Sequence, residues 1–285
     1  MELKEIVVHV DGSPRSAPRI RLGFDLAARY DARLIGLFVT PPLIETVRRW
    51  FINEEIPKHI LKEISASVAE QHREAVATAE AEFRKHAAEF GATAEWRVQE
   101  GYPATVLAVN VRYSDLTIVG QTPPDQPSIE GDEAIPERVI LGGGGPVLVV
   151  PHYGTFSTVG ERVVIAWDAS PTAARAVRDA MPLLSRASKV TVLAVNPEQS
   201  HSRHGEAPGS DIALHLARHG VKAETALSHS DEIGVGDLVL SRAFDLGADL
   251  IVMGAYGHAR LREVLLGGVT RHLLAHMTSP VLMSH

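Results

Sequence analysis

Glycines at fixed spacing near the end of the chain have the clearest chemical potential. The residues that could present backbone N–H groups to an anion are Gly254, Gly257, Gly267, Gly268, Val269 and Thr270. Glycine has no Cβ, so the backbone can approach an anion closely. The segment Thr270–Ala275 is predicted to be a helix, and a helix N-terminus adds unpaired donors and a positive dipole end. The spacing therefore predicts a phosphate-binding loop.

Two further candidates follow predicted strands. Asp168 ends one short apolar run and Val195 ends the next. In an open parallel sheet, ligands bind beyond the carboxyl ends of the strands, where the strand order reverses. Asp168 is therefore a candidate ligand-binding residue. The alternative is that Asp168 caps the helix predicted to start at Pro171, a role that Ser170 could share.

Catalytic groups are not evident in the sequence. The phosphate-binding pattern G-x-x-x-x-G-K-[ST] is absent, no lysine follows Lys222, and no G-x-S-x-G motif occurs. Phosphoryl transfer requires cationic charge and a group that positions the nucleophile. We therefore expect no catalytic residue and favour a binding protein over an enzyme, with slow hydrolysis of a bound ligand at most.

Histidines in the second half raise the alternative of a metal site. His215 and His219 are four residues apart on a predicted helix, and His201, His204 and His229 are not far away in sequence. An i,i+4 pair can hold zinc, but no Cys or Glu stands at motif spacing. We expect a solvated helix face and no metal.

The elements that would position these residues occur twice along the chain. The paired segments are residues 6–14 with 163–171, 32–39 with 188–195, 115–120 with 249–254, and 146–148 with 280–282. Four matching segments in the same order indicate a tandem repeat. We divide the chain into a first copy, residues 1–155, and a second copy, residues 156–285.

Short apolar runs alternate with helical patterns in both copies. The predicted helices are Pro18–Tyr30, 62–89, Pro171–Leu184 and Leu238–Leu246. This alternation predicts an α/β fold of two doubly wound domains, each with a mostly parallel five-stranded sheet flanked by helices. The helix 62–89 is expected to cover the sheet.

The first copy does not retain the glycine spacing. Alignment from Gly120 places Pro123 at the second glycine position and Glu133 and Ala134 at the last pair. Proline lacks the backbone donor, and nearby Glu130, Asp132 and Glu133 would repel phosphate. The run Gly142–Gly145 precedes the last strand and is predicted to be a turn. We expect the first copy not to bind a phosphate in the manner of the second.

Composition excludes several functions. The net charge is −7 and aromatic residues make up 5%, which disfavours a nucleic-acid partner. The chain has no cysteine, no leader pattern and no apolar run long enough to cross a membrane. The expectation is a cytoplasmic protein without a membrane partner.

The chain resembles the universal stress protein family over nearly its whole length. The resemblance rests on the glycine spacing, on the strand ends Val-Asp-Gly-Ser and Trp-Asp-Ala-Ser, and on the segment Ser279–Leu282. The resemblance implies ATP, or AMP or ADP, as ligand, with Mg²⁺. It assigns Asp168 and Gly254 to the ribose, Val195 and Met253 to adenine, and the glycine loop through Val269 and Thr270 to the phosphates. Two positions depart from the pattern: Gly268 replaces the usual Ser or Thr, and Ala166 stands where proline is common.

The resemblance also implies how the copies associate. Family members pair through their last strands, here Val147–Val150 and Val281–Met283, so the copies should form a pseudo-two-fold pair within one chain, with pairing of two chains left open. A stress-response module whose nucleotide state is sensed by a protein partner is the leading hypothesis. The alternatives are a module that has lost nucleotide binding and a slow ATPase or nucleotidyl transferase.

Overall fold

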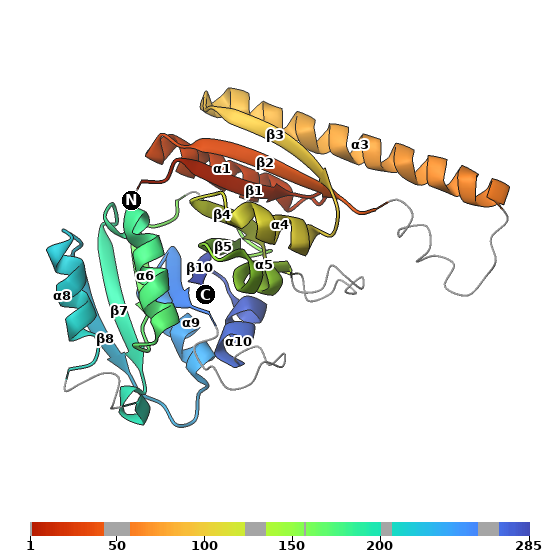
Figure 1. Ribbon diagram of the computed structural model, residues 1–285. Coiled ribbons are helices and arrows are strands. Elements are labelled where there is room, and N and C mark those ends of the chain that lie inside the picture. The colour runs from red at the N-terminus through yellow and green to blue at the C-terminus, as the bar shows by residue number, and fades with distance from the viewer. Residues whose placement is uncertain (1, 43–57, 123–134, 157, 201–206, 256–267) are drawn as a thin grey trace.

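The computed structural model describes residues 2–42, 58–122, 135–156, 158–200, 207–255 and 268–285 (Figure 1). The strands of the first copy are β1 (Glu5–Val10), β2 (Arg33–Thr40), β3 (Ala94–Glu100), β4 (Leu116–Gly120) and β5 (Val147–Val150). Those of the second are β6 (Arg162–Ala166), β7 (Lys189–Val195), β8 (Ala223–Ser228), β9 (Leu250–Gly254) and β10 (Val281–Ser284).

Helices alternate with these strands, as the sequence predicts. The first copy contains α1 (Ser16–Tyr30), α3 (Lys58–Phe90), α4 (Pro103–Val111) and α5 (Ile135–Gly143). The second contains α6 (Pro171–Leu184), a 3₁₀ turn η1 (Pro197–Ser200), α8 (Ser210–Arg218), α9 (Val235–Asp245) and α10 (Gly268–His276).

A single ten-stranded sheet runs through both copies in the order β3-β2-β1-β4-β5-β10-β9-β6-β7-β8. All pairs within each copy are parallel, whereas β5 and β10 pair antiparallel, with Leu148 opposite Leu282. The predicted fold of two doubly wound domains and the predicted pairing of the last strands are both confirmed. The antiparallel pair also covers the edge strand that each copy would otherwise expose.

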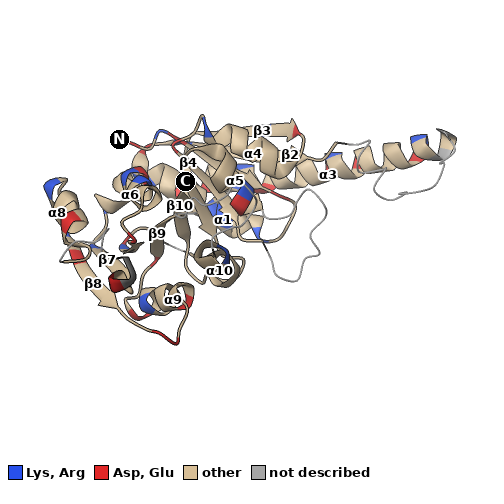
Figure 2. Ribbon diagram, turned by 60° about the horizontal axis from the view of Figure 1, so that its bottom comes forward, with Lys and Arg blue, Asp and Glu red and all other residues tan. Residues whose placement is uncertain are grey.

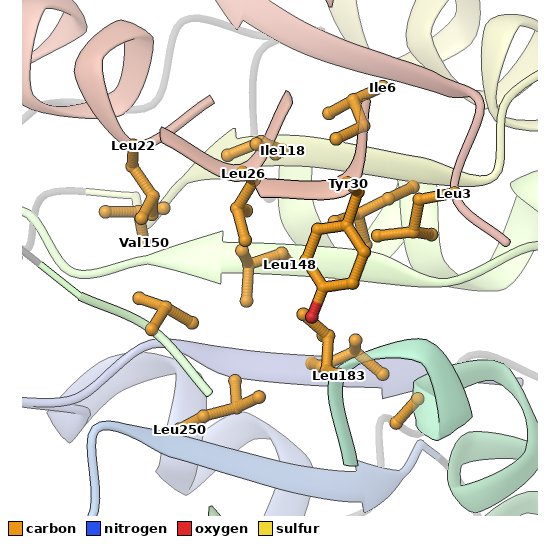
Figure 3. Close-up of a cluster of buried hydrophobic side chains, with 14 of the residues drawn as sticks. Leu3, Ile6, Leu22, Leu26, Tyr30, Ile118, Leu148, Val150, Leu183 and Leu250 are labelled. Carbon is orange, nitrogen blue, oxygen red and sulfur yellow. The ribbon is translucent and has the colours of Figure 1, made fainter. Parts of the chain in front are cut away.

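Each face of this sheet carries a core that continues from one copy into the other. On one face, Leu3, Leu26 and Leu148 of the first copy share a cluster with Leu183 and Leu250 of the second (Figure 3). On the other face, Val149 and Met283 belong to a second cluster that also spans both copies. Strands covered on both sides account for the unbroken apolar runs in the sequence.

Polar contacts between α1 and the second copy accompany this shared core. The hydroxyl of Tyr30 donates to the carbonyl of Pro182 at 3.2 Å, and Nη2 of Arg29 donates to the carbonyl of Val159 at 2.6 Å. The guanidinium of Arg186 lies 4.4 Å from the centre of the Tyr30 ring. Burial raises the pKa of Tyr30, so its hydroxyl remains a donor at neutral pH.

The long helix α3 covers the sheet only in part, which corrects the expectation that the whole helix would do so. Its C-terminal part packs Ala79, Phe83 and Phe90 into the core, and the Phe83 ring lies 5.1 Å from that of Phe24. Its N-terminal part extends beyond the sheet (Figure 1). Charges of both signs are interspersed along it, including the pair Arg73–Glu70 (Figure 2).

Several helix boundaries differ from the predictions. Helix α1 begins at Ser16 rather than Pro18, and α10 begins at Gly268 rather than Thr270. The predicted turn Gly142–Gly145 was wrong for its first two residues, because α5 continues through Gly143. A Cβ on Gly143 would lie 2.7 Å from Cγ1 of Val111, so this glycine lets α5 pack closely on α4. Among the described residues, no helix is long and apolar enough to span a membrane.

Candidate functional site

The sheet register gathers the predicted strand-end residues of the second copy. Ala166 of β6 is paired with Leu193 of β7 and with Met253 of β9. Two residues further along, Asp168 therefore lies level with Val195 on one side and Ala255 on the other. The strand order reverses between β6 and β9, so these residues surround the point where doubly wound sheets bind their ligands.

Asp168 is exposed at this edge, and its carboxylate makes one local contact. Oδ1 of Asp168 accepts the amide of Ser170 at 3.0 Å. The helix cap is Ser170 instead, whose Oγ accepts the amide of Ala173 at 3.1 Å. No basic side chain among the described residues pairs with Asp168, so its carboxylate is available to accept hydrogen bonds from a ligand.

Gly254 lies where β9 meets the start of α6. A Cβ at this position would collide with the backbone of Thr172 and Ala173. Glycine, which has no Cβ, is therefore required for α6 to begin this close to the sheet.

The end of β7 is held by a residue that the sequence analysis missed. Asn196 is buried with φ +46°, and its side chain accepts the amide of Ser230 at 3.0 Å and donates to the Ser230 carbonyl at 2.9 Å. Asparagine tolerates this left-handed conformation better than most residues. An asparagine directly after an apolar strand is the signal that could have identified it. Val195, just before it, is partly buried.

Met253 and α10 lie on the other face of the sheet from α6. Met253 is 6% exposed and packs in the same cluster as Leu273 and Leu274 of α10. Because α10 lies between the parallel strands β9 and β10, its N-terminus is at the carboxyl edge of the sheet, together with Asp168 and Gly254.

The first turn of α10 presents its backbone at this edge. Gly268 and Val269 are exposed, whereas the side chain of Thr270 is buried. Among the described residues, none has an atom within 4 Å of a Cβ built on Gly268. Arg271, which the sequence analysis also missed, adds an exposed positive charge next to this turn. Its position directly after Gly-Gly-Val-Thr is the sequence feature that could have identified Arg271.

Several predicted positions lie outside the described residues. These are Gly257 and Gly267 of the second copy and Pro123, Glu130, Asp132, Glu133 and Ala134 of the first. The described part of the site therefore consists of a carboxylate, an apolar strand end and a helix N-terminus at one edge of the sheet. This set of groups can accept hydrogen bonds from hydroxyls, pack against an apolar ring and donate to an anion.

The predicted histidine pair is described in part. The ring of His215 on α8 lies 4.8 Å from that of His219 at the end of this helix, and Nδ1 of His229 is 3.0 Å from a Glu198 carboxylate oxygen. Within the described ranges, no group of three or more His, Cys, Asp or Glu residues could hold a metal ion. His201 and His204 lie outside those ranges.

Comparison with known proteins agrees with this architecture. The universal stress protein family matches residues 2–151 and 160–285. A universal stress protein of Synechocystis, Slr1230, is 26% identical over 148 residues, which cover 51% of this chain and 49% of that protein. Universal stress protein MJ0577 of Methanocaldococcus jannaschii is 40% identical over 45 residues, covering 16% and 28%. The chain thus spans about half of the first relative and less of the second.

The fold also matches solved structures along its full length. The crystal structure of a universal stress protein from Archaeoglobus fulgidus superposes with a TM-score of 0.69, covering 99% of this chain and 96% of that one. The sequence identity is 16%, so this likeness concerns the fold alone.

Proposed function

The chain belongs to the universal stress protein family, and from this premise we propose that its second copy binds an adenine nucleotide, ATP or AMP, as a regulatory ligand. The observation that carries the proposal is the meeting of Asp168, Gly254 and the N-terminus of α10 at the strand-order reversal. Doubly wound sheets bind nucleotides at this position.

Each part of a nucleotide has a suitable partner in this arrangement. The carboxylate of Asp168 would accept hydrogen bonds from the ribose hydroxyls, and the apolar ends of β7 and β9 at Val195 and Met253 would contact the base. The amides of the α10 first turn fit a phosphate, with Mg²⁺ as its counter-ion. Arg271 would favour the same negative charge.

A binding role is favoured over catalysis. Phosphoryl transfer requires cationic charge and a positioned nucleophile, and the second copy contains no lysine after Lys222. We propose that the nucleotide changes how a protein partner recognises the molecule during a stress response, with hydrolysis slow at most.

The ribose contact gives the sharpest test of this proposal. Calorimetric titration with MgATP and with Mg-2′,3′-dideoxyATP, which lacks both hydroxyls, is carried out on wild type and on Asp168→Asn. Losing a charge-assisted hydrogen bond should weaken ATP binding about 10–100-fold. Because the variant and the dideoxy ligand remove the same contact, the two losses should not multiply.

Asp11→Asn provides the matched control, since Asp11 is the equivalent of Asp168 in the first copy. We expect it to leave nucleotide affinity unchanged. The absence of binding by wild type at millimolar MgATP would refute the proposal. If the loss of affinity from Asp168→Asn and the loss from the dideoxy ligand multiply when the two are combined, Asp168 does not contact the ribose.

A further inference from the structure

The first copy contains a charged side chain at the place that corresponds to the ligand site of the second. Its strand order also reverses between neighbours, here β1 and β4. Asp11 follows β1 as Asp168 follows β6, and Gly120 ends β4 as Gly254 ends β9. Between them lies Arg19 of α1, which is 4% exposed.

Arg19 is bonded to this edge through several atoms. Its Nη2 donates to Oδ2 of Asp11 at 2.6 Å and lies 3.1 Å from Oγ of Ser16, and its Nε donates to the carbonyl of His9 at 3.0 Å. A buried arginine with charge-assisted bonds of this kind is held in one position.

The same guanidinium occupies the space above the end of β4. A Cβ on Gly120 would collide with Nη1 of Arg19. In the second copy the helix position equivalent to Arg19 is Ala176, which is fully buried and carries no charge. The two copies therefore cover the end of this strand differently, the first with a long cationic side chain and the second with the backbone of the first turn of α6.

Asp11 is also fully engaged, in contrast to Asp168. Its Oδ1 accepts hydrogen bonds from the amide and hydroxyl of Ser13 and from the hydroxyl of Ser16, and its Oδ2 accepts from Arg19. Burial raises the pKa of Asp11, but the neighbouring charge of Arg19 and these hydrogen bonds outweigh it and hold the pKa well below its usual range. The carboxylate is thus ionised and paired at neutral pH.

We propose that Arg19 is a built-in occupant of the first copy's ligand site, where its guanidinium takes the carboxylate of Asp11 that a ligand would need. The first copy is then closed by its own side chain, and the chain binds one nucleotide and not two. The count of one rests on the proposed function of the second copy, whereas the role of Arg19 does not.

Chemical rescue tests the role of Arg19 directly. Arg19→Ala removes the atoms that ethylguanidinium supplies, and the side chain of Asp11, 38% exposed, gives this cation access from solvent. We expect the melting temperature of Arg19→Ala to fall by roughly 5–10 °C, because a buried ion pair loses one partner. Ethylguanidinium at about 10 mM should restore at least half of the lost melting temperature, because a cation that binds the vacated site stabilises the folded state.

Two matched variants control the experiment. Arg21 is exposed on the same helix, so Arg21→Ala should melt close to wild type and show no response to ethylguanidinium. The double variant Arg19→Ala, Asp11→Asn lacks the carboxylate and should not be rescued. Should Arg19→Ala be insoluble, its refolding yield with and without ethylguanidinium replaces the melting temperature.

The outcomes separate this inference from the proposed function. Failure of ethylguanidinium to act on Arg19→Ala, or equal action on Arg21→Ala, overturns the role of Arg19. Two nucleotides per wild-type chain, counted by equilibrium dialysis, also overturn it. A wild type that binds none refutes the proposed function, and the rescue experiment still decides the role of Arg19.

Discussion

At the residue scale, Asp168 and Asp11 follow equivalent strands but have different surroundings. Asp168 accepts one backbone amide, whereas Asp11 accepts two serine hydroxyls, one amide and a guanidinium. Nearby, burial lowers the pKa of His9 to about 4, so this histidine is neutral at physiological pH. The strand-end carboxylate of the first copy is thus hydrogen-bonded by side chains of that copy.

Gly268 offers a gain-of-function prediction at the same scale. Because a Cβ there meets no atom of the described residues within 4 Å, a serine side chain displaces none of them. Its hydroxyl could donate to a phosphate, and a hydrogen bond is worth about 0.5–1.5 kcal/mol. We expect Gly268→Ser to tighten MgATP binding about 2–10-fold by calorimetry, with adenosine, which has no phosphate, unaffected. Equal tightening of adenosine would contradict a phosphate contact at this turn.

The sequence singles out the second-copy candidates more readily than Arg19. Asp168, Gly254 and Gly268 are recognisable because each stands at a strand end or in a short spacing pattern. Arg19 acts on Gly120, which is distant in sequence, so its role depends on how α1 packs across β4. Arg19 is one of two arginines that flank Ile20 in the sequence, and an exposed position explains such a residue equally well.

At the element scale, the contact between α4 and α5 explains why part of the glycine run is helical although the sequence predicts a turn. Glycine has poor helix propensity, but close packing against Val111 overrides it. Likewise, the apolar stripe of α3 predicts a long helix but contains no information about where the sheet beneath it ends. Packing between distant segments decides both features.

Neighbouring glycines of α5 allow a paired test of this packing. A Cβ on Gly142 would lie 3.4 Å from Cβ of Ala108, an ordinary contact, whereas a Cβ on Gly143 would lie 2.7 Å from Cγ1 of Val111. We expect Gly142→Ala to be neutral or to stabilise by up to about 1 kcal/mol through helix propensity. Gly143→Ala should destabilise by about 1–3 kcal/mol through overpacking.

Urea denaturation measures both free energies of unfolding. The two variants change the same residue type by one methyl group on adjacent positions of one helix, so each serves as the control for the other. Equal effects of the two substitutions would contradict the close approach of α5 to α4.

At the scale of the whole molecule, one continuous sheet connects two copies with different properties. The antiparallel pair β5–β10 and the shared cores couple them, and Nε2 of Gln121 in the first copy donates to the carbonyls of Leu274 and Ala275 at 2.8 and 3.1 Å. The first copy thus supports the C-terminal end of α10, whose N-terminus is part of the candidate nucleotide site. A closed first copy can therefore serve as a scaffold for the second.

Photo-crosslinking with 8-azidoATP, followed by mass spectrometry of the labelled peptides, tests this division of roles most directly. The azide on the base should label peptides around Val195 or Met253, and excess MgATP should prevent the labelling. No peptide of residues 1–155 should be labelled in a manner that ATP prevents. ATP-protected labelling next to Asp11 or Gly120 would contradict the account, because it would place a nucleotide where Arg19 is held.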